Sequence, residues 1–227
     1  MSERTAILTG VTGGWGRAVL DRFLAQGWNV CATSRSADGG GLPEQALVVA
    51  ADLTDPVSAE QVVAAALDRF GRVDALACVA GGFLMSGPLH TSSPDDWRDQ
   101  LAVNLDTAYT VTRAALTPML EAGSGSIVYV GSRAALRPFA GAAPYIVSKA
   151  AVLALMAAVD VEVRTKGVRA NTVVANLVDT PRNRADNPDA DFSRWTTGEQ
   201  LATVIEWLCS DDSAPLSGGT IPAYGRS

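Results

Sequence analysis

The stretch Thr9-Gly10-Val11-Thr12-Gly13-Gly14-Trp15-Gly16 decides the fold of this chain. It ends the apolar run from Ala6 to Thr9 and opens a helical pattern that extends from Gly14 to Gln26. Glycines between a strand and a helix permit a tight turn. They also let backbone N–H groups approach a pyrophosphate at the helix N-terminus, where the helix dipole favours negative charge. The stretch therefore predicts a dinucleotide-binding turn in a first βαβ unit.

Beyond this turn, short apolar runs alternate with long helical patterns along the whole chain. Predicted strands cover residues 6–9, 29–34, 47–51, 75–79, 126–131, 169–174 and 220–222. Predicted helices cover residues 14–26, 57–70, 95–120, 144–165 and 197–210. Uninterrupted apolar strands such as Ile127-Val128-Tyr129-Val130 indicate burial on both faces, which a parallel sheet between two helical layers provides. We therefore expect an α/β fold, a single-domain doubly wound parallel sheet of about seven strands flanked by helices.

Composition favours one domain with a small-molecule site. The 227 residues, 48% of them hydrophobic, suffice for one core, and no linker or repeat divides the domain at 1–227. The net charge of −6 disfavours a nucleic-acid partner, because phosphate binding requires a basic stripe. Cys31, Cys78 and Cys209 lie far apart among apolar neighbours, which is typical of buried thiols in a reducing compartment. With a single histidine and no spaced ligand cluster, we expect no metal site.

The chain shows no sign of export or membrane insertion. Met1 to Arg4 lead directly into the first strand without the charged start, apolar middle and cleavage site of a signal peptide. No apolar run approaches the roughly 18 to 20 residues that a membrane-spanning helix requires. We expect a cytoplasmic protein with no membrane partner.

Residues at the carboxyl ends of the first four predicted strands form the expected cofactor site, because ligands bind at that edge of a parallel sheet. The candidates are Gly10, Thr12, Gly14, Trp15, Gly16, Ser34, Arg35, Asp52, Leu53, Ala80 and Gly81. Asp52 can accept a hydrogen bond from an adenine amino group, and the Ala80-Gly81-Gly82 turn lets the backbone approach a ribose. Each also fits a helix cap or a plain turn.

The end of the second strand bears on the choice between NADP(H) and NAD(H). An acidic residue at this place binds a free ribose 2′-hydroxyl, and the chain has Ser34-Arg35 instead. A guanidinium pairs with a 2′-phosphate, and no carboxylate is present to repel it. We therefore expect a preference for NADP(H), with NAD(H) possible. The alternative is that Arg35 is an ordinary surface charge.

Tyr145 and Lys149 are the expected acid/base pair. They lie four residues apart at the start of a helical pattern whose first turn is marked by Pro144, so both project from one face. An ammonium beside a phenol favours the phenolate and lowers the pKa of the tyrosine, which suits proton transfer between alcohol and carbonyl. Ser132 ends the preceding strand, where its hydroxyl can hold the substrate oxygen in place.

Asn104 lies within an otherwise apolar helical stretch, where a buried amide needs hydrogen-bond partners. Two interpretations remain open. The residue is a satisfied core amide, or it holds a water in a proton relay to Lys149.

These motifs resemble the short-chain dehydrogenase/reductase family over nearly the whole chain. Its pattern Thr-Gly-x-x-x-Gly-x-Gly corresponds to Thr9, Gly10, Gly14 and Gly16, and its Asn-Ser-Tyr-Lys tetrad to Asn104, Ser132, Tyr145 and Lys149. The resemblance implies a Rossmann-type fold in which Tyr145 is the acid/base, Asn104 anchors the relay water, and Lys149 binds the nicotinamide ribose. It also implies cofactor contacts from Tyr145 and from Thr180, the latter to the nicotinamide carboxamide.

Two departures from the family pattern stand out. Its Asn-Asn-Ala-Gly after the fourth strand is Cys78-Val79-Ala80-Gly81 in this chain, and its Pro-Gly after the sixth strand is Ala175-Asn176. The first weakens a stabilising turn, and the second alters the nicotinamide pocket. Together with the stretch 188–195, they make the chain similar to a subgroup that includes the dihydropteridine reductases.

Two segments are loop-like, residues 36–43 and residues 176–195. The second is long for a connector and follows a strand end, so we expect it to be a substrate-binding loop rather than a solvated connection. The candidate substrate contacts after strands four, five and six are Phe83, Leu84, Met85, Arg133, Ala134, Phe139 and Leu177. They predict a mainly apolar pocket, in which Arg133 either reads an anionic group or forms a surface ion pair.

Residues 150–159 are apolar around nearly the full circumference of their helix, which indicates that another subunit covers the outer side. We expect a homo-oligomer, and the family resemblance favours a tetramer or a dimer. The leading functional hypothesis is an NAD(P)H-dependent oxidoreductase that acts on a small carbonyl or alcohol. The alternatives are a non-redox isomerase, lyase or cyclase, and a nucleotide-sensing protein, on the same fold.

Overall fold

A seven-stranded parallel sheet forms the centre of the molecule, in the order β3-β2-β1-β4-β5-β6-β9. The computed structural model describes residues 4–35 and 41–227, so residues 36–40 of the first predicted loop lie outside it. The strands are β1 Thr5–Thr9, β2 Asn29–Ser34, β3 Leu47–Ala50, β4 Ala75–Cys78, β5 Gly125–Ser132, β6 Val168–Ala175 and β9 Thr220–Ala223. The predicted parallel sheet is confirmed, and the structure adds its register, which places the ends of β1 and β4 side by side.

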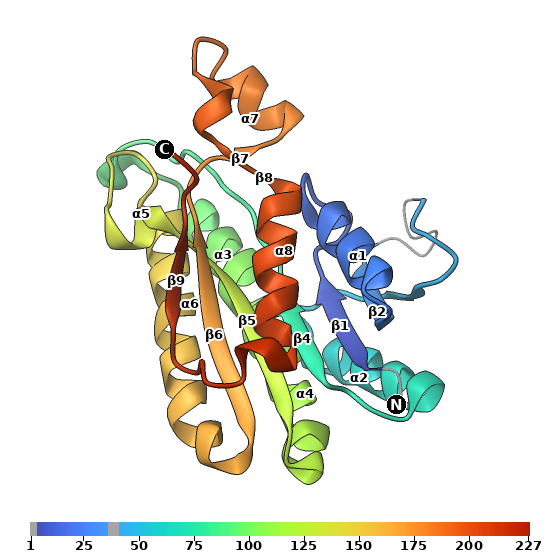
Figure 1. The fold of residues 1–227 in the computed structure, drawn as a ribbon. Helices are drawn as coiled ribbons and strands as arrows, with labels where there is room; N and C mark the ends of the chain where they lie inside the picture. Colours follow the sequence, from blue (N-terminus) through green and yellow to red (C-terminus); the bar gives the residue numbers. More distant parts are fainter. Residues whose placement is uncertain (1–3, 36–40) are drawn as a thin grey trace.

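Helices cover both faces of the sheet (Figure 1). On one face, α1 (Gly16–Ala25) packs against α8 (Gly198–Cys209), and their buried side chains form one apolar core with the sheet. On the other face lie α2 (Pro56–Phe70), α4 (Thr107–Ala122) and α6 (Ala143–Val163), which enclose a second core. The chain is thus a three-layer sandwich, and the residues that follow each strand gather at its carboxyl edge.

The helix predicted over residues 95–120 is interrupted. It consists of α3 (Pro94–Leu101), a π-helical turn (Ala102–Asp106) and α4. In the π turn, the Thr107 N–H donates to the carbonyl of Ala102, five residues earlier. The widened turn coincides with Asn104, whose side chain bonds to groups outside its own helix. Such turns occur frequently at functional sites, and this one lies beside the site described below.

Residues 176–195 were predicted as a loop, and they contain ordered elements. β7 (Val178–Asp179) pairs with β8 (Thr196–Thr197), and between them lie α7 (Pro181–Asp186) and a 3-10 turn (Phe192–Arg194). Figure 1 shows this unit beyond the carboxyl ends of the main strands. Side-chain caps account for the order: the hydroxyl of Thr180 accepts from Asn183 N at 3.1 Å, and Arg184 forms a two-bond ion pair with Asp179.

Short elements complete the chain, namely α5 (Arg133–Leu136) and the 3-10 turns Leu89–Thr91, Arg164–Lys166 and Asp211–Ser213. The three cysteines are buried and free. Within the described residues, no helix combines the length and the apolar character that crossing a membrane requires.

Helix α6 buries one face against the sheet and leaves a second apolar face uncovered. Val152, Met156 and Val159 are buried, whereas Val147 and Val161 are 41% and 66% exposed. The all-round apolar character that the sequence indicated is therefore real, and a single copy of the chain covers only half of it.

Candidate active site

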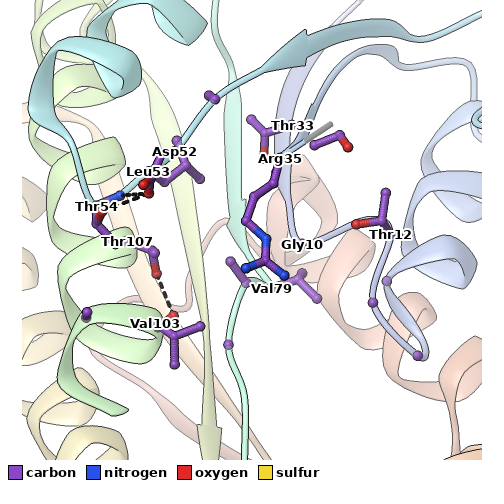
Figure 2. Close-up of a pocket in the computed structure, with 18 of the residues that line it drawn as sticks. Gly10, Thr12, Thr33, Arg35, Asp52, Leu53, Thr54, Val79, Val103 and Thr107 are labelled. Atoms are coloured by element: carbon purple, nitrogen blue, oxygen red, sulfur yellow. Dashed lines mark hydrogen bonds between the residues drawn. The ribbon is translucent and has the colours of Figure 1, made fainter. Parts of the chain in front are cut away.

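Three adjoining cavities lie along the carboxyl edge of the sheet. The first, of about 500 Å³, is bounded by the ends of β1 to β4 and by α3 (Figure 2). Every residue predicted there for the cofactor lines it: Gly10, Thr12, Gly14, Trp15, Gly16, Ser34, Arg35, Asp52, Leu53, Ala80 and Gly81. Sequence reasoning missed the wall contributed by Asp99, Gln100, Ala102, Val103 and Thr107, because contacts between a helix and a distant strand end leave no local pattern.

The glycine turn is built by close backbone approach. Gly10 has a φ of +70°, and a Cβ at this position would lie 2.6 Å from the backbone of Ala80. A Cβ at Gly16 would lie 2.0 Å from the carbonyl oxygen of Gly10. The Thr9 hydroxyl accepts hydrogen bonds from the N–H groups of Val79 and Ala80, each at 3.1 Å, and so joins the ends of β1 and β4. This bridge holds the turn that the Cys78-Val79 departure was expected to weaken.

Arg35 reaches into this first cavity. Figure 2 shows its guanidinium between the Asp52–Thr54 segment and the turn that carries Gly10 and Thr12. The Asp52 carboxylate accepts from the N–H and the hydroxyl of Thr54, at 2.9 and 2.7 Å. These bonds, with a smaller contribution from Arg35, lower the pKa of Asp52. The cavity is therefore lined by both a positive group and an ionised carboxylate.

The second cavity, of about 260 Å³, brings Ser132, Tyr145 and Lys149 together. Ser132 ends β5, and the other two project from the first turns of α6, as their spacing predicted. The cavity shares Gly14, Trp15, Val79 and Gly81 with the first one, so the two are continuous. Thr180 lines it as well.

The electrostatics differ from the sequence prediction at Tyr145. Burial raises the pKa of Tyr145, and the hydrogen bond with Ser132 opposes that rise. Lys149 is 6% exposed, and its Nζ donates to the carbonyl of Val130 at 2.9 Å. Burial lowers the pKa of Lys149 to about 8. The prediction that the ammonium holds the pKa of Tyr145 below its ordinary value is therefore wrong for this arrangement, because desolvation dominates both groups.

Asn104 is a satisfied buried amide. Its Oδ1 accepts from Gly82 N at 3.0 Å, and its Nδ2 lies within 3.1 Å of the Gly82 and Gln100 carbonyls and of Ser148 Oγ. The side chain thus ties the turn after β4 to α6. Of the two interpretations left open by the sequence, the geometry supports the first, since both the oxygen and the nitrogen of the amide have partners within the protein.

The third cavity, of about 880 Å³, opens beside Tyr145. All of the predicted substrate contacts line it, namely Phe83, Leu84, Met85, Arg133, Ala134, Phe139 and Leu177. The ring of Phe83 meets that of Tyr145 edge-on at 4.9 Å. The loop unit contributes Arg182, Asn183, Asp186 and Asn187, and α5 is followed by Arg137, none of which was singled out from the sequence.

Arg133 is held by the C-terminal segment. Its Nη1 donates to the carbonyl oxygen of Ser227 at 2.9 Å, and its guanidinium lies 5.1 Å from the centre of the Tyr224 ring. Asn176, the residue that departs from the family pattern, donates to Ser227 Oγ at 2.8 Å. Both residues line the third cavity, and their hydrogen bonds to Ser227 hold the C-terminal segment next to it.

Comparisons with known proteins agree with this geometry. The sequence profile of the short chain dehydrogenase family matches residues 4–191. The chain is 33% identical to 2-(R)-hydroxypropyl-CoM dehydrogenase of Xanthobacter autotrophicus, with 98% of each chain covered. It is 27% identical to the 3-oxoacyl-[acyl-carrier-protein] reductase FabG of Salmonella typhimurium, over 98% of this chain and 96% of the relative.

Solved structures show the same fold. A short-chain type dehydrogenase/reductase from Mycobacterium ulcerans superposes with a TM-score of 0.91 at 25% identity, over 100% of this chain and 90% of the other. ElxO with NADP bound superposes with a TM-score of 0.90 at 24% identity, over 99% and 98% of the two chains.

Proposed function

The chain belongs to the short-chain dehydrogenase family, and from this membership we propose that it is an NADP(H)-preferring carbonyl reductase, or alcohol dehydrogenase in reverse. One observation carries the proposal. Tyr145, Ser132 and Lys149 line the second cavity, which is continuous with the first cavity at the glycine turn. On its other side, the second cavity shares Phe83, Ser132 and Tyr145 with the third cavity. A donor and an acceptor of hydride would therefore meet at the acid/base residue.

The first cavity fits a dinucleotide. Its glycine turn is tight, because a Cβ at Gly10 or Gly16 would strike backbone atoms of the protein itself. Helix α1 begins at Gly16 with its dipole directed at the turn, which favours a phosphate there. Arg35, Asp52 and the Ala80-Gly81 turn would hold the adenosine end, while Tyr145, Lys149 and Thr180 would contact the nicotinamide end. The bound cofactor supplies the hydride.

The protein's own residues handle the proton. In the reductive direction, the Tyr145 hydroxyl gives its proton to the substrate oxygen, and the same group takes the proton back when an alcohol is oxidised. Ser132 Oγ accepts from Ala134 N at 3.2 Å, and its O–H, which hydrogen-bonds with Tyr145 here, would donate to the substrate oxygen once that oxygen lies between them.

Steady-state consumption of NADPH tests the function. The purified protein is titrated with NADPH and with NADH by fluorescence, and oxidation of the nicotinamide is then followed over ketones, quinones, β-keto thioesters and quinonoid pterins. Consumption on any carbonyl supports the reductase. Tight binding with no consumption across the panel would favour the isomerase, lyase, cyclase or nucleotide-sensing alternatives.

Replacing Arg35 with Gln is expected to weaken NADPH binding by roughly tenfold and to leave NADH binding unchanged, because only NADPH carries the 2′-phosphate. Fluorescence titration with NADPH and with NADH measures both affinities. Arg17→Gln is the matched control, since Arg17 lies on α1 in an exposed ion pair with Asp21 and does not line the cavity. Equal losses for the two cofactors would show that Arg35 does not read the phosphate.

Gly81→Ala is expected to lower kcat by roughly tenfold to a hundredfold, because small displacements of catalytic groups are costly. A Cβ at Gly81 would lie 2.6 Å from Asn104 Oδ1 and 3.1 Å from Lys149 Nζ. At Gly82 the nearest atom would be 3.7 Å away, on Val103, so Gly82→Ala is the control in the same turn. Similar kcat values for both variants would remove the role assigned to the Gly81 contact.

We also propose that the uncovered apolar face of α6 lies against a second copy of the chain, as a homodimer or a tetramer in the cytoplasm. Val147 and Val161 mark this face. Light scattering of the purified protein measures the assembly directly.

A further inference from the structure

The third cavity gathers positive charge in an acidic protein. The chain carries a formal net charge of −6, yet this cavity is lined by Arg133, Arg137 and Arg182 and by a single acidic residue, Asp186. The adjoining second cavity adds Lys149 and no acidic residue. A neutral ketone carries no anionic group that these arginine and lysine side chains could bind.

Several polar groups of this cavity already form bonds within the protein. The amide of Asn183 donates to the carbonyl of Val178 at 2.8 Å, and that of Asn187 to the carbonyl of Asn183 at 3.0 Å. Asn176 and Arg133 each donate a hydrogen bond to Ser227. These bonds hold the four side chains in place around the cavity.

Arg182 and Arg137 are the guanidinium groups left for a ligand. Arg182 pairs with Asp186 at 3.8 Å, and the two side chains are 79% and 61% exposed, so this pair contributes little and opens at small cost. Within residues 4–35 and 41–227, Arg137 has no ion-pair partner. Arg182 lines both the second and the third cavity, which places it at the junction beside the catalytic residues.

Large apolar side chains line the cavity together with these arginines. They are Phe83, Leu84, Met85, Phe139 and Leu177, and all are between 36% and 56% exposed. Exposed large apolar side chains around one cavity mark a surface that a ligand covers. The lining therefore matches a molecule that combines a reactive carbonyl, an apolar part and an anionic group.

We propose that the substrate is a ketone, or the corresponding secondary alcohol, that carries a carboxylate or sulfonate bound by Arg182 with assistance from Arg137. This inference rests on the proposed reductase function, because it is Tyr145 and Ser132 that fix where the carbonyl lies. Arginine suits the task, since its planar donors match the oxygens of a carboxylate or sulfonate.

Matched substrates test the charge preference. The probes are 4-oxopentanoate, 5-oxohexanoate and 6-oxoheptanoate, each beside its methyl ester, with NADPH consumption as the readout. The wild type is expected to reduce at least one acid with a kcat/KM roughly tenfold or more above that of its ester. Reduction of every ester as efficiently as its acid would overturn the inference and leave the reductase function intact.

Variants of the two arginines test which residue is responsible for the preference for the acid over its ester. Arg182→Gln is expected to raise KM roughly tenfold more for the preferred acid than for its ester, and Arg137→Gln to show a smaller difference of the same sign. Arg113→Gln is the control, because Arg113 forms an exposed ion pair with Glu60 away from the cavity. An equal loss for acid and ester in Arg182→Gln would overturn the assignment, as would a weakening of NADPH binding comparable to that in Arg35→Gln.

Binding measurements distinguish a failure of the proposed anion site from a failure of the proposed reductase function. If the wild type consumes no carbonyl, the reductase proposal fails, and calorimetry with hexanoate and hexanamide on the NADP-saturated protein then judges the anion site. Tighter hexanoate binding that is lost in Arg182→Gln supports the site. Equal binding of the two probes would overturn it.

Discussion

Replacing Tyr145 with Phe is expected to lower kcat by a factor on the order of 10² to 10⁴, the range that a positioned general acid contributes. The variant keeps the aromatic ring and its edge-on contact with Phe83 at 4.9 Å, so the cavity retains its shape. Only the hydroxyl is lost, and with it the proton that balances hydride addition to the carbonyl. Binding of NADPH should therefore stay within about twofold of the wild type.

Stopped-flow and steady-state assays with the best carbonyl of the panel measure this loss, and fluorescence titration measures the cofactor. Tyr109→Phe is the control, because Tyr109 on α4 is 51% exposed and lies outside the three cavities. Unchanged turnover in Tyr145→Phe would contradict the proposal that the Tyr145 hydroxyl transfers the proton. A loss of NADPH binding equal to the loss of kcat would show instead that Tyr145 acts through the cofactor site.

Lys149→Met is expected to lower kcat by a factor on the order of 10² or more and, at the same time, to change how stability depends on pH. The pKa of Lys149 falls from 10.5 to about 8 because burial disfavours its charged form. Below about pH 8 the folded protein therefore holds an unfavourable charge, at a cost of about 3 kcal/mol relative to the unfolded chain. Between pH 8 and 10.5 the folded state releases this proton while the unfolded state keeps it, so the contribution of Lys149 to stability rises with pH.

Chemical denaturation of the wild type and of Lys149→Met between pH 7 and 10.5 measures whether the contribution of Lys149 to stability rises with pH. The difference in free energy of unfolding, wild type minus Lys149→Met, should increase by about 3 kcal/mol across this window. The difference is the useful quantity, because burial raises the pKa of Cys31 to about 12 and this thiol makes stability fall with pH in both proteins. A flat difference would mean that Lys149 is solvated and has an ordinary pKa.

The cofactor half of the site was predictable because its signals are local. Gly10 and Gly16 follow a strand and open a helix, and a backbone that must approach within hydrogen-bond distance excludes other residues at these positions. Arg35 and Asp52 were found by counting from strand ends, and both line the first cavity. The spacing of Tyr145 and Lys149 likewise fixes them on one face of α6, next to Ser132.

The substrate half was predictable only in part. Phe83, Phe139 and Leu177 follow strand ends and were found by that rule, whereas Arg137 and Arg182 were not. Arg182 belongs to α7, a helix of only six residues whose order depends on the Thr180 cap and on the pair of Arg184 with Asp179. In the sequence this segment has the composition of a loop, because caps and ion pairs between neighbours produce no periodic apolar pattern.

By itself, the sequence determined the layered α/β fold and the place of the glycine turn, and it placed the proposed acid/base pair on one face of one helix. Apolar periodicity and short-range spacing are properties of neighbouring residues, and they survive without a structure. Only the tertiary structure decided that Asn104 is satisfied within a π turn, that burial raises the pKa of Tyr145, and that arginines from separate segments face one cavity. Desolvation and charge clustering depend on how much protein surrounds a group in space, and no stretch of sequence contains that quantity.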